Sequence, residues 1–195
     1  KKLSKKDGYR LKADYLKSFM SRKKPKLGAL FSSGKDSSYA LWTMMKQNHD
    51  IRCLITLRSK NKYSWMFHTP NIEIAELQAK ASEIPLILKE TKGKKEEELS
   101  DMRDALLEAK DRHGIEGIVT GALYSSYQRD RVEKVCDELG LKVFSPLWHI
   151  DQEEEMRQLL RNDFRIILSS VAAEGLDSSW LGREISEKDI DSLVK

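Results

Sequence analysis

The stretch that decides the fold is Leu27-Gly28-Ala29-Leu30-Phe31-Ser32-Ser33-Gly34-Lys35-Asp36-Ser37-Ser38. Its apolar first part predicts a buried strand, and the amphipathic residues from Asp36 onward predict a helix. A serine- and glycine-rich turn between them presents the unpaired N–H groups of the first helical turn to an anion. Gly34 permits close approach of the chain, while the serine hydroxyls and Lys35 add donors and positive charge. The turn therefore predicts a pyrophosphate cradle; the alternative is a serine-capped helix without a ligand.

Two better-known phosphate loops do not fit this turn. A Walker loop requires GxxxxGK followed by Ser or Thr, but Asp36 follows Lys35 and Gly28 lies one residue too far upstream. A dinucleotide fingerprint requires three glycines, and the turn has one. What remains resembles the PP-loop, Ser-Gly-Gly-x-Asp-Ser, of the ATP pyrophosphatases, which cleave ATP between its α and β phosphates. Ser33 stands where most of these enzymes have glycine.

Strand and helix patterns alternate outward from the turn. This alternation predicts right-handed βαβ units and a doubly wound α/β fold with a mostly parallel, Rossmann-like sheet and a small C-terminal appendage. The predicted strands are 27–31, 51–57, 85–88, 117–120, 142–144 and 164–169. The predicted helices are 36–47, 71–82, 94–113, 124–139, 151–162 and 187–195.

The composition restricts the class of protein. Apolar residues make up 39% and charged residues 34% of the 195-residue chain, which allows one sizeable core with a charged surface. The sequence has no run of about 18 apolar residues, as a membrane span requires, and no apolar secretory signal. Cys53 and Cys136 stand far apart, in no CxxC pair, which excludes a zinc knuckle and a disulfide framework. We therefore expect a cytoplasmic protein with no membrane partner.

Charge is unevenly distributed along the chain. Residues 1–26 carry nine lysines and two arginines against two aspartates, whereas the other 169 residues carry 24 basic and 29 acidic groups. Such a basic arm either binds an acidic partner or is a solvated extension that packs Tyr15, Leu16 and Phe19 on the body. Because aromatic and arginine residues are not interleaved there as base stacking requires, we favour the extension and expect no nucleic acid partner.

The helix predicted at 124–139 carries a second polar block. Its apolar stripe is Val132, Val135, Cys136 and Leu139. At 100° per residue, Gln128 falls about 40° and Arg129 about 60° from the centre of that stripe, so polar groups of the first turns point inward. Those turns lie above the carboxyl ends of the strands, where a ligand crevice forms. Arg129 and Arg131 suit a phosphate or a carboxylate; the alternative is a surface network with Glu133.

Several further polar residues fall at the carboxyl ends of predicted strands. His68 and Asn71 either bind substrate or adenine, or are structural. Glu174 either positions a cationic substrate group or serves a turn. Asp36 either binds Mg²⁺, directly or through water, or caps its own helix.

Seven segments together resemble the diphthine–ammonia ligase family, over roughly residues 27–185. The block most typical of that family is Tyr127-Gln128-Arg129-x-Arg131-Val132-Glu133. The other segments are Phe31–Ser37, Met66–Asn71, Gly117–Ala122, Pro146–Trp148, Ala173–Asp177 and Trp180–Arg183.

The resemblance implies a ligase that amidates diphthine on translation elongation factor 2 to diphthamide. ATP and ammonium are consumed through an acyl-adenylate, and AMP and pyrophosphate are released. The expected catalytic residues are Lys35, Asp36, Arg129 and Arg131. The expected ATP and pyrophosphate site comprises Ser32, Ser33, Gly34, Lys35, Asp36, Ser37, Ser38 and Gly121. The expected substrate contacts are His68, Asn71, Tyr127, Gln128, Glu133 and Glu174, and Asp36 is the expected Mg²⁺ ligand.

The resemblance also implies a division of the chain. Residues 1–26 form the basic extension, 27–145 the PP-loop ATP-binding domain, and 146–195 a substrate-side segment. Family members usually continue into a Gly-Glu-Gly-Gly-Glu segment; because the chain stops at Lys195 without it, we expect the last segment to be truncated, or the site to close differently. Two other functions stay open: a tRNA-modifying PP-loop enzyme that uses the basic arm, and a nucleotide-binding module without turnover. The oligomeric state stays open as well.

Overall fold

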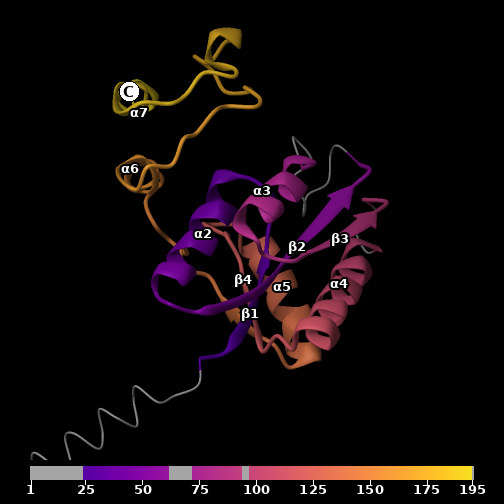
Figure 1. The fold of residues 1–195 in the computed structure, drawn as a ribbon. Helices are drawn as coiled ribbons and strands as arrows, with labels where there is room; N and C mark the ends of the chain where they lie inside the picture. The colour runs from indigo at the N-terminus through magenta and orange to yellow at the C-terminus, as the bar shows by residue number, and fades with distance from the viewer. Residues whose placement is uncertain (1–23, 62–71, 94–96, 195) are drawn as a thin grey trace, which may run out of the picture.

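A parallel sheet between two layers of helices forms the body of the molecule (Figure 1). The structure is a computed structural model that describes residues 24–61, 72–93 and 97–194. The strands are β1 (Lys26–Leu30), β2 (Asp50–Ser59), β3 (Leu86–Thr91), β4 (Gly117–Val119) and β5 (Lys142–Phe144). The helices are α2 (Lys35–Lys46), α3 (Ile74–Ser82), α4 (Glu97–His113), α5 (Ser126–Leu139), α6 (Gln152–Arg161) and α7 (Glu187–Leu193), with a 3₁₀ turn, η1, at Ser178–Trp180.

The strand order is β3-β2-β1-β4-β5, and every pair is parallel. The central strand β1 pairs with β2 on one side and with β4 on the other, so the order of the strands reverses at β1. In doubly wound sheets the crevice beyond the carboxyl ends at such a reversal is where ligands bind. The predicted fold is confirmed, and the loops after β1 and β4 are the ones that meet at this crevice.

Each face of the sheet has its own apolar core. On one face, Leu27, Leu54 and Val119 pack with residues of α2, α3 and α6. On the other face, Ile55 and Ile118 pack with residues of α4 and α5. Burial of each such side chain stabilises the fold by roughly 1.5–3 kcal/mol. The sheet is therefore covered on both sides, as a parallel sheet requires.

The two cysteines belong to the core of the α4–α5 face. Cys53 and Cys136 are buried and free. Burial raises the pKa of each thiol to about 12, so neither forms a thiolate near neutral pH. Cys136 is thus a small apolar core residue, as its position on the stripe of the helix predicts.

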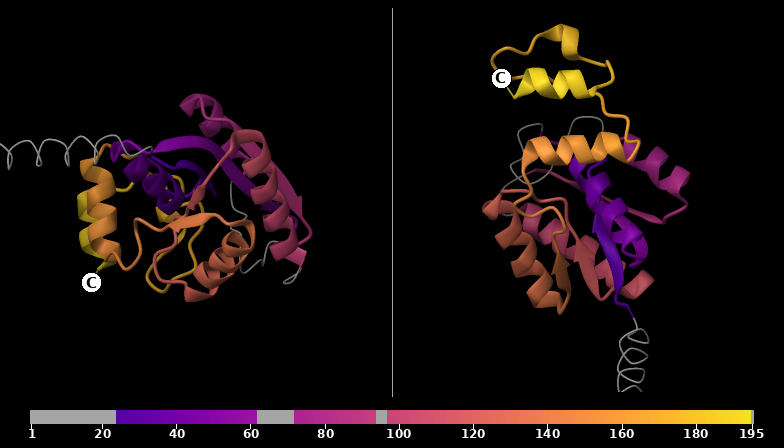
Figure 2. Two further views of the ribbon diagram at one scale, coloured as in Figure 1. Left: turned by 90° about the horizontal axis from the view of Figure 1, so that it is seen from below. Right: turned by 90° about the vertical axis from the view of Figure 1, so that its left-hand side faces the viewer.

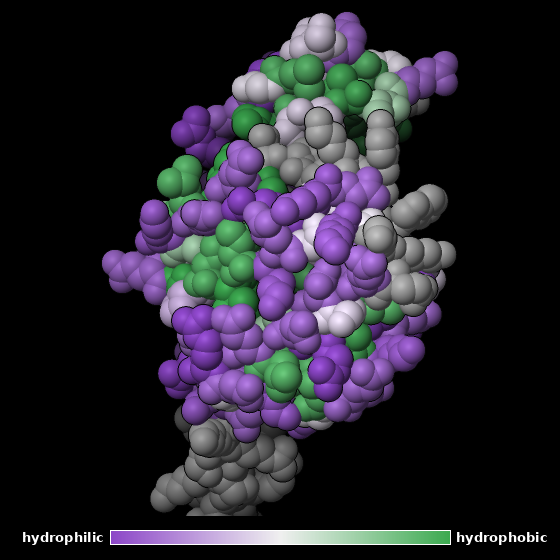
Figure 3. All heavy atoms as spheres, turned by 90° about the vertical axis from the view of Figure 1, so that its right-hand side faces the viewer, coloured by the Kyte–Doolittle hydropathy of each residue, from purple (hydrophilic) through white to green (hydrophobic). Residues whose placement is uncertain are grey.

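The surface around α4 is mostly hydrophilic (Figure 3). Acidic residues begin this helix and basic residues end it, an order that complements the helix dipole. Across the ranges that the structure describes, no helix combines the length and the apolar character that a membrane crossing needs.

The predicted sixth strand, 164–169, is wrong. Only two isolated bridges form there, Ile167 with Glu184 and Leu168 with Leu181, and the segment does not join the sheet. The apolar residues of this segment alternate: Ile166 is buried, but the next side chain, Ile167, is 56% exposed. That pattern covers one face only, whereas a strand inside this sheet would be covered on two.

Beyond α6 the chain forms the predicted appendage (Figure 2). Ile185 and Ile190 pack onto the core on the α2 side, and the guanidinium of Arg157 on α6 binds Glu187 and Asp191 of α7. Most of the predicted basic extension, together with His68 and Asn71, lies outside the described residues.

Candidate active site

The turn after β1 is shaped by its own serines. The backbone N–H of Ser32 donates to Oγ of Ser37 at 3.2 Å, and that hydroxyl donates to the carbonyl of Gly34 at 3.1 Å. Ser33 has φ = 62°, in the left-handed region that favours glycine. This conformation explains why glycine suits position 33 of such a loop, and why serine there carries a conformational cost.

The helix that follows the turn begins without a side-chain cap. Gly34 stands at the N-cap of α2, whereas Ser125 caps α5 and Asp151 caps α6 by accepting N–H groups of their first turns. A helix start without a side-chain acceptor leaves N–H groups available to an anion and places the positive end of the helix dipole beside it. The start of α2 is therefore suited to a phosphate.

Gly121 lets the loop after β4 approach the start of α2. A side-chain carbon at this position would lie 2.7 Å from the carbonyl carbon of Asp36 and 2.7 Å from the backbone nitrogen of Ser37. Real side-chain carbons do not come this close to backbone atoms. The absence of a side chain at 121 thus sets how the two loops meet at the crevice.

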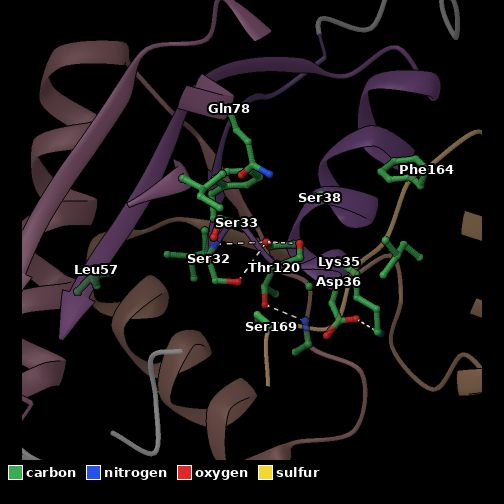
Figure 4. A pocket seen from close by; sticks show the side chains of 18 of the residues that line it. Ser32, Ser33, Lys35, Asp36, Ser38, Leu57, Gln78, Thr120, Phe164 and Ser169 are labelled. Carbon is green, nitrogen blue, oxygen red and sulfur yellow. Dashed lines mark hydrogen bonds and ion pairs between the residues drawn. The ribbon is translucent and has the colours of Figure 1, made fainter. Parts of the chain in front are cut away.

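The two loops enclose a cavity of about 830 Å³, a volume within the range of small-molecule sites (Figure 4). One wall comprises the turn after β1, together with Thr120, Gly121 and Ala122. The segment 164–170, which follows α6 and does not join the sheet, also lines the cavity. The cavity therefore lies between the sheet body and the chain that leads to the appendage.

Lys35, in the turn after β1, is bound by two carboxylates. Its ammonium group binds a carboxylate oxygen of Asp36 and, at 2.7 Å, Oε2 of Glu155 on α6. Burial alone would lower the pKa of Lys35, but the two carboxylates together raise it, so the lysine stays charged. Lys35 can therefore exchange its carboxylate partners for phosphate oxygens.

Glu155, the second carboxylate that binds Lys35, is buried on α6. Its side chain is 0% exposed, and its Oε1 has no hydrogen-bond partner among the described residues. Burial, opposed by the Lys35 hydrogen bond and aided by the negative charge of Asp36, raises the pKa of Glu155 to about 7.

The comparisons with known proteins assign the family. The family model described as diphthamide synthase N-terminal domain matches residues 25–143, and the one described as diphthamide synthase C-terminal domain matches residues 151–195. The chain belongs to the diphthamide synthase family. The predicted resemblance is therefore confirmed, and with it the expectation of an enzyme of the ligase class.

Curated relatives carry the name diphthine–ammonia ligase. The protein of Mus musculus is 33% identical over 83% of this chain and 68% of its own length, and that of Homo sapiens is 31% identical over the same shares. The protein of Saccharomyces cerevisiae is 33% identical over 80% of this chain and 28% of its own length. Among solved structures, a U34-tRNA thiolase from Methanococcus maripaludis has 14% identity over 88% of this chain and 66% of that chain, with a TM-score of 0.48, a likeness too low to bear on function.

The residues that the diphthamide synthase resemblance singles out fall into two sets. Ser32 to Ser38, Gly121 and Gln128 line the cavity. Tyr127, Arg129, Arg131 and Glu133 belong to α5 but are not among the described lining residues, and Glu174 is exposed in a turn beyond residue 170.

The two arginines of α5 lie over aromatic rings. The guanidinium of Arg129 lies 4.5 Å from the centre of the Trp148 ring and 3.3 Å from a carboxylate oxygen of Glu133. The guanidinium of Arg131 lies 3.6 Å from the centre of the Tyr127 ring. Stacking of this kind fixes the direction of a guanidinium and leaves its edge available for other acceptors.

Three features of the site were not predicted. They are Glu155, Gln78 on α3, and the wall formed by residues 164–170. The sequence holds a signal for Glu155, because it stands four residues before Leu159 and therefore on the buried face of α6. However, Glu155 also belongs to a run of five polar residues, 151–155, and such a run suggests the charged first turn of a helix and not a buried position. The position of Gln78, three residues after the buried Ala75, is a comparable signal on α3.

A metal site built by the protein alone is not found in the described part of the chain: no three His, Cys, Asp or Glu side chains are placed to share an ion. Asp36 does line the cavity, beside the serines of the turn. Mg²⁺ that accompanies a nucleotide is commonly bound by one or two carboxylates together with phosphate oxygens and water. A single carboxylate beside an uncapped helix start that suits a phosphate fits that mode of binding.

Proposed function

We propose that this chain is a diphthine–ammonia ligase that converts diphthine on translation elongation factor 2 to diphthamide. Membership of the diphthamide synthase family supports the reaction class, and the names of the curated relatives support the substrate. The observation that carries the proposal is the uncapped start of α2, with Lys35 beside it, in the cavity at the reversal of the sheet.

The first step activates the carboxylate of diphthine. A carboxylate oxygen attacks the α-phosphorus of ATP, the bond from that phosphorus to the bridging oxygen of the β-phosphate breaks, and pyrophosphate leaves. The N–H groups at the start of α2, the hydroxyls of Ser32 and Ser37, and the ammonium of Lys35 stabilise the charge that develops on the pyrophosphate. Ser33, Gly34, Ser38 and Gly121 shape the cradle.

The second step forms the amide. The nitrogen of ammonia, after ammonium has lost a proton, attacks the acyl carbon, and AMP leaves with the former carboxylate oxygen. Because the reaction joins three reactants, most of the rate enhancement comes from their positioning. We assign that role to Arg129 and Arg131 for the carboxylate or the α-phosphate, and to His68, Asn71, Tyr127, Gln128, Glu133 and Glu174 for the protein substrate.

Mg²⁺ would be held at Asp36 and would share the charge of the phosphates. In the described structure the carboxylate of Asp36 binds Lys35. Mg²⁺ would therefore compete with this lysine for the carboxylate. We propose that residues 27–145 bind ATP and that residues 146–195 contribute the substrate side.

An exchange assay tests this function. The chain is incubated with ATP, labelled pyrophosphate and elongation factor 2 that carries diphthine, and label entering ATP is measured with and without ammonium. We expect exchange that depends on the factor, and amide formation only when ammonium is present. The control is the same factor without the diphthine modification. Exchange that requires tRNA instead would favour a tRNA-modifying enzyme, and no exchange with any acceptor would favour a nucleotide-binding module.

A further inference from the structure

Glu155 is a carboxylate that the fold buries completely beside the candidate site. Its side chain is 0% exposed, and its Oε2 accepts a hydrogen bond from the ammonium group of Lys35 at 2.7 Å. Taking a carboxylate out of water costs free energy that a single ion pair often does not return, and a well-packed apolar side chain would avoid this cost. The stability of α6 therefore does not explain a carboxylate at this position, and its contact with Lys35 is the feature to explain.

The neighbouring glutamates of α6 give the contrast. The carboxylate of Glu153 binds Arg157. The carboxylate of Glu154 accepts a hydrogen bond from Gln158, so each of these two glutamates has a partner four residues further along the same helix. Their side chains are 40% and 45% exposed. Glu155 differs from both, because its partner stands 120 positions earlier in the chain and lines the cavity.

Lys35 has two carboxylate partners of different kinds. A lysine ammonium is carried by a flexible four-carbon stem, so its direction depends on the groups that bind it. Asp36 is the next residue along the chain, lies beside Lys35 at the cavity and is 39% exposed (Figure 4). A partner in the same turn moves with the lysine and leaves its direction relative to the rest of the cavity open. Glu155 belongs to another element and is closed off from solvent, so it ties the ammonium group to α6.

The ammonium group can keep its bond to Glu155 while it binds a phosphate. It has three N–H donors, and the two carboxylates use two of them. Replacement of the exposed Asp36 by phosphate oxygens would leave the bond to Glu155 in place. Because the side chain of Glu155 has no exposed surface, it does not touch a ligand in the cavity and acts through Lys35.

We propose that Glu155 is a positioning residue, whose buried carboxylate fixes the ammonium group of Lys35 at the start of α2 before ATP binds. The inference rests on the proposed role of Lys35 toward the departing pyrophosphate and goes beyond it, because it names the group that places this charge. A charge that is already in place stabilises the transition state without the cost of ordering a flexible side chain during the reaction. Loss of the position should therefore lower kcat and kcat/KM for ATP alike.

A double-mutant cycle in the exchange assay tests this role. The kcat and the KM for ATP are measured for Glu155→Met in the unmodified chain and in Lys35→Ala. Burial raises the pKa of Glu155 to about 7, so the assay is run at pH 8, where this carboxyl is ionised. Methionine preserves the length of the side chain and removes the carboxylate, whereas Glu155→Gln keeps a carbonyl oxygen that can accept from the lysine. Glu154→Met is the control, because it introduces the same side chain at the neighbouring, partly exposed position.

We expect Glu155→Met to lower kcat about tenfold and to change the KM for ATP by less than about twofold. In Lys35→Ala the same substitution should change kcat by less than about twofold, because no ammonium group is left to position. Glu155→Gln should lower kcat only about threefold, since the acceptor is kept and the charge is lost. Glu154→Met should match the unmodified chain.

An equal loss of kcat in both backgrounds would mean that Glu155 serves the fold alone and would overturn the inference, as would an unchanged kcat in Glu155→Met. If Glu155→Met does not fold, the cycle is completed with Glu155→Gln, whose smaller loss must likewise disappear in Lys35→Ala. Absence of exchange by the unmodified chain with every acceptor would overturn the proposed function, and the positioning role with it. Exchange by the unmodified chain together with additive losses would overturn the positioning role alone.

Discussion

Two polar blocks follow neighbouring parallel strands, one after β1 and one after β4, and the fold uses them differently. In the first, Ser32–Ser38, every residue lines the cavity. In the second, Ser126–Glu133, only Gln128 and Val132 do so. Position above the carboxyl ends of parallel strands therefore brings a block near a ligand crevice, but it does not aim each side chain into it.

The difference follows from how each helix begins. The start of α2 has no side-chain cap, lies against Gly121, and lines the cavity. The start of α5 is closed by Ser125, and its arginines stack on Trp148 and Tyr127. The first block is thus arranged to bind an anion directly, and the second to hold cations in fixed directions beside the site.

The largest expected effect comes from comparing Lys35 of the first block with Arg129 of the second block. Lys35→Ala removes the ammonium group that would stabilise the departing pyrophosphate, and we expect kcat/KM for ATP in the exchange assay to fall about 100-fold. With Arg129 on the diphthine carboxylate, Arg129→Ala should raise the KM for the elongation factor by up to about tenfold and leave the KM for ATP unchanged; a raised KM for ATP alone would place this arginine at the α-phosphate instead. Equal losses in the two variants, with the same change in the KM for ATP, would contradict the distinction between the blocks.

The next effect concerns the close contact between Gly121, in the loop that precedes the second block, and the start of α2. Gly121→Ala places a side-chain carbon 2.7 Å from backbone atoms of α2, and we expect the free energy of unfolding to fall by about 1–3 kcal/mol. Gly34→Ala is the control, because its added carbon would meet only Oγ of Ser32, at 3.4 Å, and its φ of −79° suits alanine. Chemical denaturation measures both. A stable Gly121→Ala would mean that the contact between the loops is not tight in solution.

Sequence patterns were sufficient for the sheet and for the first block. The apolar run at β1, the turn and the amphipathic α2 each obey a local rule, and the predicted mostly parallel sheet follows from the alternation of strands and helices. The strand predicted at 164–169 is wrong because a local pattern does not identify the partner of a segment. Alternating apolar residues predict a ribbon with one covered face, but they do not say which partner covers it; here the partner is the chain at 181–185.

The site was predictable only where it is local in sequence. Lys35 and its turn could be assigned to the cavity from the sequence because all of residues 32–38 are neighbours along the chain. Glu155 binds Lys35 across 120 residues, and Gln78 reaches the cavity from α3. Each occupies a position on a helix face that local rules assign to the core, so a polar residue there indicates a tertiary partner but does not name it.

The free energy of unfolding should depend on pH through Glu155, one of the two carboxylates that bind Lys35. The pKa of Glu155 is about 7 in the folded chain against an ordinary value of 4.5, so the folded state binds the proton more tightly than the unfolded state. The stability that this group contributes is therefore full below about pH 4.5 and is lost as the pH rises through 7. Between about pH 5 and pH 8, we expect the unfolding free energy of the unmodified chain to fall, relative to Glu155→Gln, on the order of 2 kcal/mol. Glu154→Gln, on the same helix but partly exposed, should follow the unmodified chain; identical pH profiles for Glu155→Gln and the unmodified chain would contradict the assignment.

The smallest expected effect tests the cap that closes the second block. Oγ of Ser125 accepts the N–H of Gln128 at 3.3 Å, so Ser125→Ala leaves that N–H without its side-chain acceptor and should lower the unfolding free energy by about 1 kcal/mol. Ser126→Ala, one residue inside the helix and exposed, should change it by less than about 0.5 kcal/mol. Neither variant should alter the dissociation constant of ATP, because the anion site that we propose belongs to α2. Tighter or weaker ATP binding in Ser125→Ala alone would mean that the start of α5 also contacts the nucleotide, and that the two blocks form a single phosphate site.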